Sequence, residues 1–304
     1  MIALGFDTSN YTTSAAWFDG NKGDNSGRLL DVELGKLGLR QSEALFSHVR
    51  RLPDIAGALG ELEDIAAVGA SEKPRETENS YMPCFLAGVS VAKVTAQMLG
   101  KPYFGFSHQQ GHIAAASWSA GRMDLLEREH LAWHLSGGTT ELLYVRPEGV
   151  AVRCEIIGGT EDVSAGQLID RAGQALGLKF PSGRELDSLS KAASVKELYK
   201  PKINGTHFSL SGVEHKMHSL IQSGASPQNA AYFTLASMIY TVGKVTDNAK
   251  RKYGDLPVLF SGGVASNSLL RELIPDGIFA EPRYSTDNAM GIAILTYRSI
   301  AENG

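Results

Sequence analysis

Cysteine is scarce in this sequence, which has only Cys84 and Cys154 among its 304 residues. Two thiols so far apart exclude a disulfide scaffold and a thiolate zinc site, and they suit a reducing compartment. No apolar run approaches the ~18 residues that crossing a bilayer requires. Residues 1–6 are apolar, but no basic leader precedes them. We therefore expect no signal peptide and no membrane attachment, and we place the protein in the cytoplasm.

The sequence also lacks a strong excess of either charge. Its 29 Lys and Arg against 33 Asp and Glu give a net charge of -4, which argues against a protein that coats nucleic acid but permits a local basic patch. Two basic stretches, around residues 196–202 and 250–252, can contact phosphates, although such runs are usually solvated faces. A hydrophobic share of 43% is that of a globular enzyme with a full core.

One pattern of strand, polar turn and strand occurs twice. Residues 2–6 and 12–18 have the composition of strands and flank the turn formers 7–10, and residues 131–135 and 140–145 repeat this around Ser-Gly-Gly-Thr. A repeat of this kind predicts two copies of one domain, each opening with a hairpin whose tip is rich in backbone N–H donors. Two such tips across a cleft would bind the phosphates of a nucleotide.

The rest of the chain alternates between helical and strand patterns, which predicts an α/β protein. Pro53 is expected to kink the first helix or to end its first half. We expect two domains, 1–125 and 126–304, with the last helix able to pack back on the first. The expected helices cover 41–59, 83–99, 165–176, 184–193, 227–253, 267–273 and 288–301, and the further strands cover 65–70, 103–106, 150–157, 258–260 and 277–279.

The sharpest local motif is a pair of histidines four residues apart. Ser107 and Gln110 have the spacing of a capping box, so a helix is expected to begin at His108. His108 and His112 then lie on one helix face and can share a metal ion. Because a helix N-terminus repels cations, a third, anionic ligand is expected from elsewhere. The alternative is a pair of capping or surface histidines. Gln109 replaces the glutamate that a zinc protease uses as its base, which disfavours peptide hydrolysis.

A second motif, Ser-Gly-Gly-Val-Ala-Ser-Asn at 261–267, follows an apolar strand and opens a helix. Paired glycines allow a ligand to approach and leave amide N–H groups facing it. The motif has neither the Gly-Lys-Ser/Thr of a Walker loop nor the third glycine of the dinucleotide fingerprint. An ordinary strand-to-helix turn is the alternative.

Several acidic residues are weaker candidates. Asp170, with Gly183 and Asp187 beyond the next turn, can hold a ribose diol, although a solvated or salt-bridged helix residue is the more common case. Asp287 has the sequence context of a helix N-cap, and Asp7 that of an ordinary turn residue.

Taken in order, these motifs resemble the TsaD family of tRNA N6-adenosine threonylcarbamoyltransferases, formerly labelled O-sialoglycoprotein endopeptidases. The resemblance extends over almost the whole chain. The matching stretches are Leu4-Gly-Phe-Asp-Thr-Ser9, His108-x-x-Gly-His112, Leu135-Ser-Gly-Gly-Thr139, Asp170-Arg171, Phe180-Pro-Ser-Gly183, Phe208-Ser-Leu-Ser-Gly212, Ser261-Gly-Gly-Val-Ala-Ser-Asn267 and Ser285-Thr-Asp-Asn288.

The resemblance implies the two-lobed fold of actin, Hsp70 and sugar kinases (ASKHA), with duplicated RNase H-like domains. It also implies that His108, His112 and Asp287 hold one iron or zinc ion. The residues that match catalytic positions are Asp7, Ser136, Gly137 and Gly138. Those that match positions for an adenine nucleotide (threonylcarbamoyl-AMP, ATP or AMP) are Leu135, Ser136, Gly137, Gly138, Thr139, Asp170, Gly183, Asp187, Gly262, Gly263 and Asn267.

The implied activity is an acyl transfer, with AMP as the leaving group. A threonylcarbamoyl group moves from threonylcarbamoyl-AMP to N6 of the adenosine beside the tRNA anticodon, a reaction of t6A biosynthesis. The implied partners are tRNA and the family's partner proteins of the t6A complex, and dimerisation is left open. Because the chain is acidic overall, we expect those partner proteins to supply basic surface for tRNA.

The sequence departs from the family at two places. Tyr11 and Thr12 stand where members usually carry adjacent acidic residues, and residues 72–76 replace an expected Gly-Pro-Gly turn. Two alternatives therefore stay open beside the tRNA-modifying transferase. One is a carbamoyltransferase acting on a non-tRNA acceptor, and the other is a catalytically silent nucleotide-binding scaffold of a tRNA-modification complex. A metalloprotease is the weakest reading.

Overall fold

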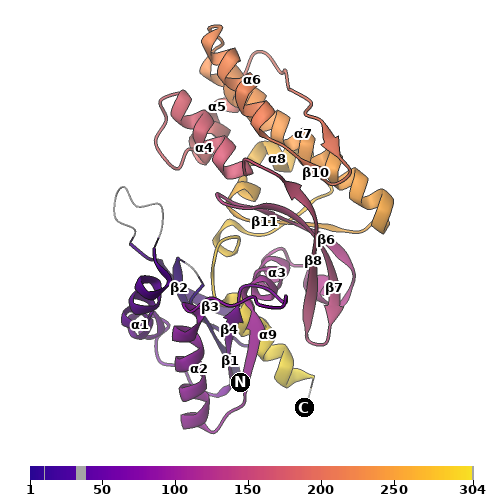
Figure 1. The fold of residues 1–304 in the computed structure, drawn as a ribbon. Helices are drawn as coiled ribbons and strands as arrows, with labels where there is room; N and C mark the ends of the chain where they lie inside the picture. The colour runs from indigo at the N-terminus through magenta and orange to yellow at the C-terminus, as the bar shows by residue number, and fades with distance from the viewer. Residues whose placement is uncertain (10, 32–38, 303–304) are drawn as a thin grey trace. The chain divides into compact units, whose positions relative to one another are not determined.

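The structure is a computed structural model that describes residues 1–9, 11–31 and 39–302 (Figure 1). The chain forms two compact units. Unit 1 comprises Met1–Arg128, Arg146–Cys154 and Thr286–Gly304, and unit 2 comprises Glu129–Val145 and Glu155–Ser285. Each unit is therefore assembled from separate stretches, and the two continuous domains expected from the sequence, 1–125 and 126–304, stay a prediction.

Unit 1 is built on a five-stranded sheet in the order β3-β2-β1-β4-β5. β1 pairs antiparallel with β2 and parallel with β4, which in turn pairs parallel with β5. The hairpin predicted at the start of the chain is confirmed, although Asn10 of its turn lies outside the described residues. The strands are Ile2–Asp7 (β1), Thr12–Phe18 (β2), Gly23–Leu29 (β3), Ile65–Lys73 (β4) and Tyr103–Ser107 (β5).

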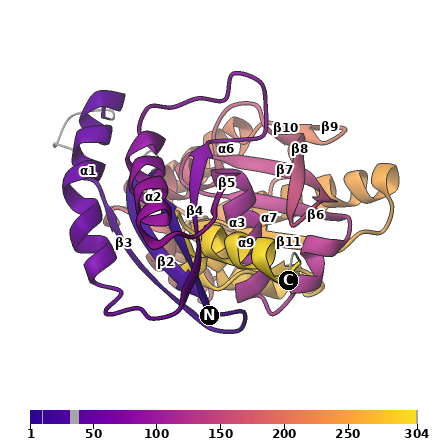
Figure 2. The same ribbon diagram turned by 90° about the horizontal axis from the view of Figure 1, so that it is seen from below.

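Helices pack on both faces of this sheet (Figure 2). Two of them, Gln41–Gly57 (α1) and Phe85–Leu99 (α2), cover one face, and Met290–Ala301 (α9) covers the other. His108–Ser119 (α3) packs against α9 and leads into the 3-10 turn Met123–Glu127. Glycines let α9 approach the strands: a Cβ built on Gly5 would lie 2.4 Å from the backbone nitrogen of Ala293. The last helix is thus an integral part of the core of unit 1.

Unit 2 repeats the same sheet pattern. Its seven strands follow the order β12-β11-β6-β7-β8-β10-β9, and β6 pairs antiparallel with β7 and parallel with β11. β8-β7-β6-β11-β12 therefore corresponds to β3-β2-β1-β4-β5, so the predicted duplication is confirmed. The strands are His130–Leu135 (β6), Thr140–Glu148 (β7), Ala151–Thr160 (β8), Ile203–Asn204 (β9), His207–Phe208 (β10), Val258–Ser261 (β11) and Ile278–Phe279 (β12).

The helices of unit 2 enclose its apolar core, at whose centre Trp133, Phe208 and Phe260 are fully buried. The indole N–H of Trp133 donates to Thr246 Oγ1 at 2.9 Å, so its one polar atom is satisfied. No helix among the described residues is both long and apolar enough to cross a membrane. The helices and 3-10 turns are Ala165–Ala175 (α4), Gly183–Ser190 (α5), Ser211–Gln222 (α6), Pro227–Tyr253 (α7), Gly263–Ser266 (η2), Ser268–Leu273 (α8) and Pro282–Tyr284 (η3).

One local expectation is wrong in part. Pro53 does not end the first half of its helix, because α1 continues through it to Gly57. Proline costs a helix one backbone hydrogen bond, and here the Leu52 and Ile55 side chains buried on either side hold the helix on the sheet. The sequence pattern did not predict β3, β9, β10 or α6.

Candidate functional site

The histidine pair lies in the first turns of α3, as the motif predicts. The Ser107 hydroxyl accepts from the Gln110 backbone N–H at 3.3 Å, and the Gln110 side chain accepts from the Ser107 N–H at 2.9 Å. This capping box fixes the start of the helix at His108. The side chains of His108 and His112 are only 17% and 10% exposed. Both rings are thus mostly covered by other residues.

Close contact between two helices brings a distant segment to these histidines. A Cβ built on Gly291, in the first turn of α9, would lie 1.8 Å from the carbonyl oxygen of Gly111. Only glycine at this position lets α9 cross α3 backbone to backbone. Because Asp287 comes three residues before the start of α9, this crossing places its carboxylate over the histidine pair.

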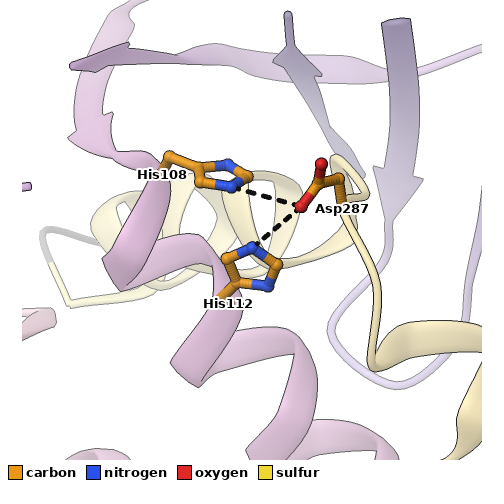
Figure 3. Close-up of side chains that lie close together, drawn as sticks. All are labelled: His108, His112 and Asp287. Carbon is orange, nitrogen blue, oxygen red and sulfur yellow. Dashed lines mark ion pairs between the residues drawn. The ribbon is translucent and has the colours of Figure 1, made fainter. Parts of the chain in front are cut away.

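Three side chains from two distant segments of the chain converge at this point (Figure 3). Asp287 Oδ1 lies 3.5 Å from His108 Nε2 and 3.2 Å from His112 Nε2. One ligand atom from each residue lies within 4.8 Å of the others. Ligand atoms bound about 2.1 Å from one tetrahedral ion are about 3.4 Å apart, so the spacing fits a shared divalent ion. Asp287 is not the N-cap of α9, a position that Ala289 occupies.

Asp7, at the end of β1, orients the first histidine. Its Oδ2 lies 2.6 Å from His108 Nδ1, while its Oδ1 accepts the backbone N–H of Ser9 at 2.8 Å. A hydrogen bond from Nδ1 to a carboxylate leaves Nε2 as the coordinating nitrogen, which is the usual outer-shell arrangement of a metal-binding histidine. Asp7 is thereby a positioning residue for His108.

Asp7, His108 and Asp287 shift one another's pKa values. Burial opposes ionisation of Asp7, but His108 outweighs it by charge and hydrogen bond and holds the pKa of Asp7 below its usual value. Burial likewise opposes a charged His108, yet Asp7 and Asp287 raise its pKa to about 10. Burial also works against ionised Asp287, whereas hydrogen bonds from both histidines hold its pKa well below the usual value. At neutral pH the cluster therefore holds two carboxylates and a protonated His108, and a cation that binds Nε2 of this ring must displace a proton.

The site also includes Thr12, one of the two residues at the first departure from the family pattern. Thr12 lies at the start of β2 and is buried. Its hydroxyl donates to Asp287 Oδ2 at 3.4 Å. The neutral hydroxyl adds no further negative charge beside the carboxylates of Asp7 and Asp287.

We predict that Asp7→Asn weakens metal binding about 10- to 100-fold, the usual effect of losing an outer-shell carboxylate. The amide keeps the size of the side chain but loses the charge that fixes the His108 ring. The affinity for Zn²⁺ is measured by competition with a chromophoric chelator. Asp54→Asn, on the exposed part of α1, is the matched control. Equal affinities for both variants would show that Asp7 does not support the site.

The glycine loops of unit 2 lie at the carboxyl ends of two parallel strands. β6 ends at Leu135 and β11 at Ser261, and the two strands pair in parallel. Gly262 has a φ of 89°, and a Cβ there would lie 2.1 Å from the carbonyl oxygen of Leu135. The two loops therefore meet backbone to backbone at this edge, where open α/β sheets bind ligands.

The N-terminus of α4 supports the first of these loops. The Ser164 hydroxyl donates to the Gly137 carbonyl at 2.7 Å, and the Gly166 N–H donates to the Ser136 carbonyl at 3.1 Å. Gly137 and Gly138 are exposed, and a Cβ on either would meet no atom within 4 Å. A helix N-terminus beside an open glycine loop is a favourable place for an anion.

Hydrogen bonds between Ser136 and Thr139 join the two ends of the first loop. The Ser136 N–H donates to the Thr139 carbonyl at 2.8 Å, and the Thr139 N–H donates to the Ser136 hydroxyl at 3.0 Å. In the second loop, Asn267 is buried and caps α8 by accepting the Leu270 N–H at 2.9 Å. Gly263 is open, because a Cβ built there would meet no atom within 4 Å.

The two carboxylates expected at the ribose make structural contacts. Asp170 accepts the backbone N–H of Ser182 at 2.8 Å. Asp187 accepts the N–H and the hydroxyl of Ser268, both at 3.0 Å, and so ties α5 to the start of α8. Gly183 begins α5 and has open space around a built Cβ, with Ile169 as its nearest neighbour at 3.8 Å. A role of these residues in holding ribose stays a prediction.

The Phe-Ser-Leu-Ser-Gly motif at 208–212 contacts Asp162, a partner that the sequence did not predict. Asp162 accepts the hydroxyl of Ser209 and the backbone N–H of Leu210, the latter at 2.9 Å, at the start of α6. Burial of Asp162 favours its neutral form, but the hydroxyls of Ser209 and Ser211 outweigh this effect and lower its pKa. The carboxylate thereby joins the end of β8 to α6.

We predict that Asp162→Asn lowers the free energy of unfolding by about 1–2 kcal/mol at pH 7, the usual effect of losing hydrogen bonds to a partly exposed charged acceptor. Because the folded-state pKa lies below the ordinary value of 3.8, this contribution is present above about pH 4 and is lost as the pH falls further. Urea unfolding at pH 7 and pH 3 measures it. A difference between variant and wild type that grows on acidification would contradict the assignment.

Three features of the site were missed by sequence reasoning: the support of the glycine loop by Ser164 and Gly166, the contact of Gly291 with Gly111, and the role of Asp162. A capping box at Ser164 and Gln167 was readable as a helix start. The neighbouring sequence did not show that the start of this helix would contact the loop at residues 136–139.

The fold and site define a class of protein. The structure is similar to full-length HypF in its phosphate- and nucleotide-bound form (TM-score 0.64, 14% identity, covering 99% of this chain and 56% of that one). The chain thus spans about half the length of HypF. It is also similar to component A of (R)-2-hydroxyglutaryl-CoA dehydratase from Acidaminococcus fermentans (TM-score 0.60, 15% identity, 99% of both chains). The fold is the two-lobed α/β fold of actin, Hsp70 and sugar kinases.

Within this class the chain belongs to the TsaD family, described as tRNA N6-adenosine threonylcarbamoyltransferase, whose family model matches residues 58–294. A relative of that name from Clostridium perfringens is 32% identical over 276 residues, covering 84% of this chain and 77% of the relative. Another from Thermus thermophilus is 31% identical and covers 83% and 77%. One from Dehalococcoides mccartyi is 29% identical and covers 98% and 93%.

Proposed function

We propose that this protein transfers a threonylcarbamoyl group from threonylcarbamoyl-AMP to N6 of the adenosine beside the anticodon of tRNA. The observation that carries the proposal is the convergence of His108, His112 and Asp287. These residues come from two family motifs about 175 residues apart in sequence and meet at the spacing of ligands to one ion. Membership of the TsaD family supports the same reaction.

We infer that His108, His112 and Asp287 hold one iron or zinc ion. Two imidazole nitrogens and a carboxylate form a donor set that suits either metal. Such an ion, when bound, supplies a Lewis acid and a template for the threonylcarbamoyl group. Asp7 fixes the ring of His108 by its hydrogen bond to Nδ1. Asp7 and Asp287 together provide the negative charge that a cation needs at the start of α3.

In unit 2, we infer that the glycine loops hold the adenylate. The proposed role of the backbone N–H groups of Gly137 and Gly138 is to donate to phosphate or to charge that develops on oxygen during transfer; the open space around both glycines supports it. The N-terminus of α4 adds its favourable field for an anion. Leu135, Ser136 and Thr139 shape this loop. The remaining residues that we assign to the nucleotide are Asp170, Gly183, Asp187, Gly262, Gly263 and Asn267.

The proposed reaction needs no covalent intermediate on the protein. The N6 nitrogen of adenosine attacks the carbonyl carbon of the threonylcarbamoyl group, and a new C–N bond forms. The bond from that carbon to the phosphate oxygen breaks with its electron pair, so AMP leaves as an anion, and the N6 proton passes to solvent. The protein contributes by positioning the two substrates and stabilising the developing charge.

The test is in vitro modification of unmodified tRNA. The full chain is incubated with tRNA, threonine, bicarbonate, ATP and an enzyme that makes the adenylate, with and without the family's partner proteins. Digestion and mass spectrometry then identify the nucleosides. We expect threonylcarbamoyladenosine with the wild type and with Asp54→Asn, and none with His108→Ala/His112→Ala. Unmodified tRNA under both conditions, from protein that still binds AMP, would contradict the proposal.

A second candidate is transfer of a carbamoyl group to an acceptor other than tRNA. It is favoured by Tyr11 and Thr12, which replace family acids, and by the position of Thr12 within 3.4 Å of Asp287. The same assay separates the two candidates. Unmodified tRNA, with AMP released faster than in an incubation that lacks this protein, rules out the first function and favours the second.

A further inference from the structure

The positive charge of unit 2 is concentrated in two short segments. Eight of the fourteen Lys and Arg residues of unit 2 lie in residues 191–202 and 244–252, together with only two of its fifteen acidic residues. These 21 residues carry a net charge of +6 in a unit whose net charge is -1. The rest of unit 2 is therefore strongly acidic, so this segregation distinguishes the two segments from an ordinary mixed surface.

The structure places both segments side by side. Residues 194–205, here called the lysine segment, run parallel to α7. Asn229 Oδ1 accepts the Ser194 N–H at 3.0 Å, near the start of the helix. The Asn248 side chain donates to the Gly205 carbonyl at 2.7 Å, near its end. These two contacts are 19 residues apart on α7, or about 28 Å.

Further contacts fix the lysine segment along this length. The Tyr199 N–H donates to the Ser237 hydroxyl of α7 at 2.8 Å, and Pro201 is buried. Two lysines lie over tyrosine rings of the helix: Lys196 Nζ is 5.9 Å from the ring centre of Tyr232, and Lys200 Nζ is 5.4 Å from that of Tyr240. Contact with a ring orients an ammonium group without neutralising it.

The exposed charges form one row. Lys196, Lys200 and Lys202 are exposed on the lysine segment. Arg251 of α7 is also exposed, as is Lys244, whose ammonium pairs with Asp247 at 3.7 Å. By helical periodicity they lie on the strip that carries Tyr240 and the lysine segment, since they follow Tyr240 by about one turn and three turns.

We propose that this row binds the phosphate backbone of the RNA substrate. The inference rests on the proposed function, which makes tRNA the substrate, and assigns a surface for it. RNA presents a continuous line of phosphates, and lysines on a fixed backbone can bind them with little loss of conformational freedom. The row contains no base-reading pattern, so the contact fixes position and orientation and does not select sequence.

The test removes three charges from the row. The full-length variant Lys196→Gln/Lys200→Gln/Lys202→Gln is compared with Lys22→Gln/Lys93→Gln/Lys101→Gln, which removes three exposed lysines of unit 1. The control is matched, because Lys93 also lies over a tyrosine ring, that of Tyr103, at 5.0 Å. Affinity for fluorescently labelled, unmodified tRNA is measured by anisotropy over a salt series from about 50 to about 300 mM KCl.

We expect the first variant to bind tRNA about 10- to 100-fold more weakly than wild type at about 0.1 M salt, because each lost phosphate contact costs up to about 8-fold there. The slope of log K against log salt should fall by about 2 to 3. The control variant should retain both values. Replacement of the same three lysines by arginine should also retain them, since arginine keeps the charge.

Two outcomes overturn the inference. One is tRNA affinity and salt dependence unchanged in the glutamine variant, which would leave this surface to an acidic protein partner. The other is loss of affinity in the arginine variant as well, which would indicate a structural role. Either result leaves the proposed function intact as long as the wild type modifies tRNA. If the wild type neither binds nor modifies tRNA, both proposals fail together.

Discussion

The double variant His108→Ala/His112→Ala is expected to bind a divalent ion about 10⁴-fold more weakly than the wild type. Four-ligand zinc sites have binding free energies of about 10–16 kcal/mol, or about 3 kcal/mol and roughly two orders of magnitude per ligand. Both imidazoles reach Asp287 at the distances of a shared ion. Their loss leaves only one carboxylate to compete with water for the metal.

The matched control removes two other histidines from one helix face. His215 and His218 are exposed on α6, three residues apart, so His215→Ala/His218→Ala deletes a similar surface pair far from Asp287 in sequence. Isothermal titration with Zn²⁺ should give one site per chain in this control. Retention of a one-to-one site in the variant that lacks His108 and His112 would refute their assignment as ligands.

Gly291→Ala is expected to lower both the stability of the protein and its affinity for the metal. The added Cβ would lie 1.8 Å from the carbonyl oxygen of Gly111, so the helices must separate. Overpacking against backbone costs about 3 kcal/mol. Because Asp287 lies three residues before the start of α9, separation also moves its carboxylate away from His108 and His112, and we expect metal affinity to fall more than about 10-fold.

Two other glycines provide controls for this effect. Gly243 lies inside α7, and a Cβ there meets no atom within 4 Å, so Gly243→Ala should raise the free energy of unfolding by about 0.5–1 kcal/mol. Gly111→Ala should be milder than Gly291→Ala, because its Cβ would meet the flexible end of Ile292 at 3.0 Å. Urea unfolding and zinc titration check this order. Equal stability of wild type and Gly291→Ala would contradict the close helix crossing.

Much of the fold was predictable because its signals are local. The two hairpins follow from apolar strands around polar turns, and the start of α3 follows from the capping box at Ser107. The missed strand β3 has the polar sequence of an edge strand, Gly-Asp-Asn-Ser-Gly-Arg-Leu, with no apolar alternation. The strands β9 and β10 have two residues each, which is too short for a periodic pattern.

The site could be predicted only in part, because its geometry depends on contacts between distant segments. The need for an anion beside the histidines followed from the helix dipole, but the resemblance to the family, and not the spacing, identified Asp287. Asp7 had the context of a turn residue, and its contact with His108 depends on the order of the sheet. The proximity of Thr12 to Asp287 has the same origin.

X-ray absorption at the metal edge of the zinc- or iron-loaded protein tests the central claim most directly, because it reports the atoms bound to the ion. An ion held by His108, His112 and Asp287 should show two imidazole nitrogens and carboxylate oxygen at about 2.0–2.2 Å. The imidazole signal should be absent after His108→Ala/His112→Ala. A spectrum with sulfur at about 2.3 Å, from Cys84 or Cys154, or one without imidazole in the wild type, would contradict it.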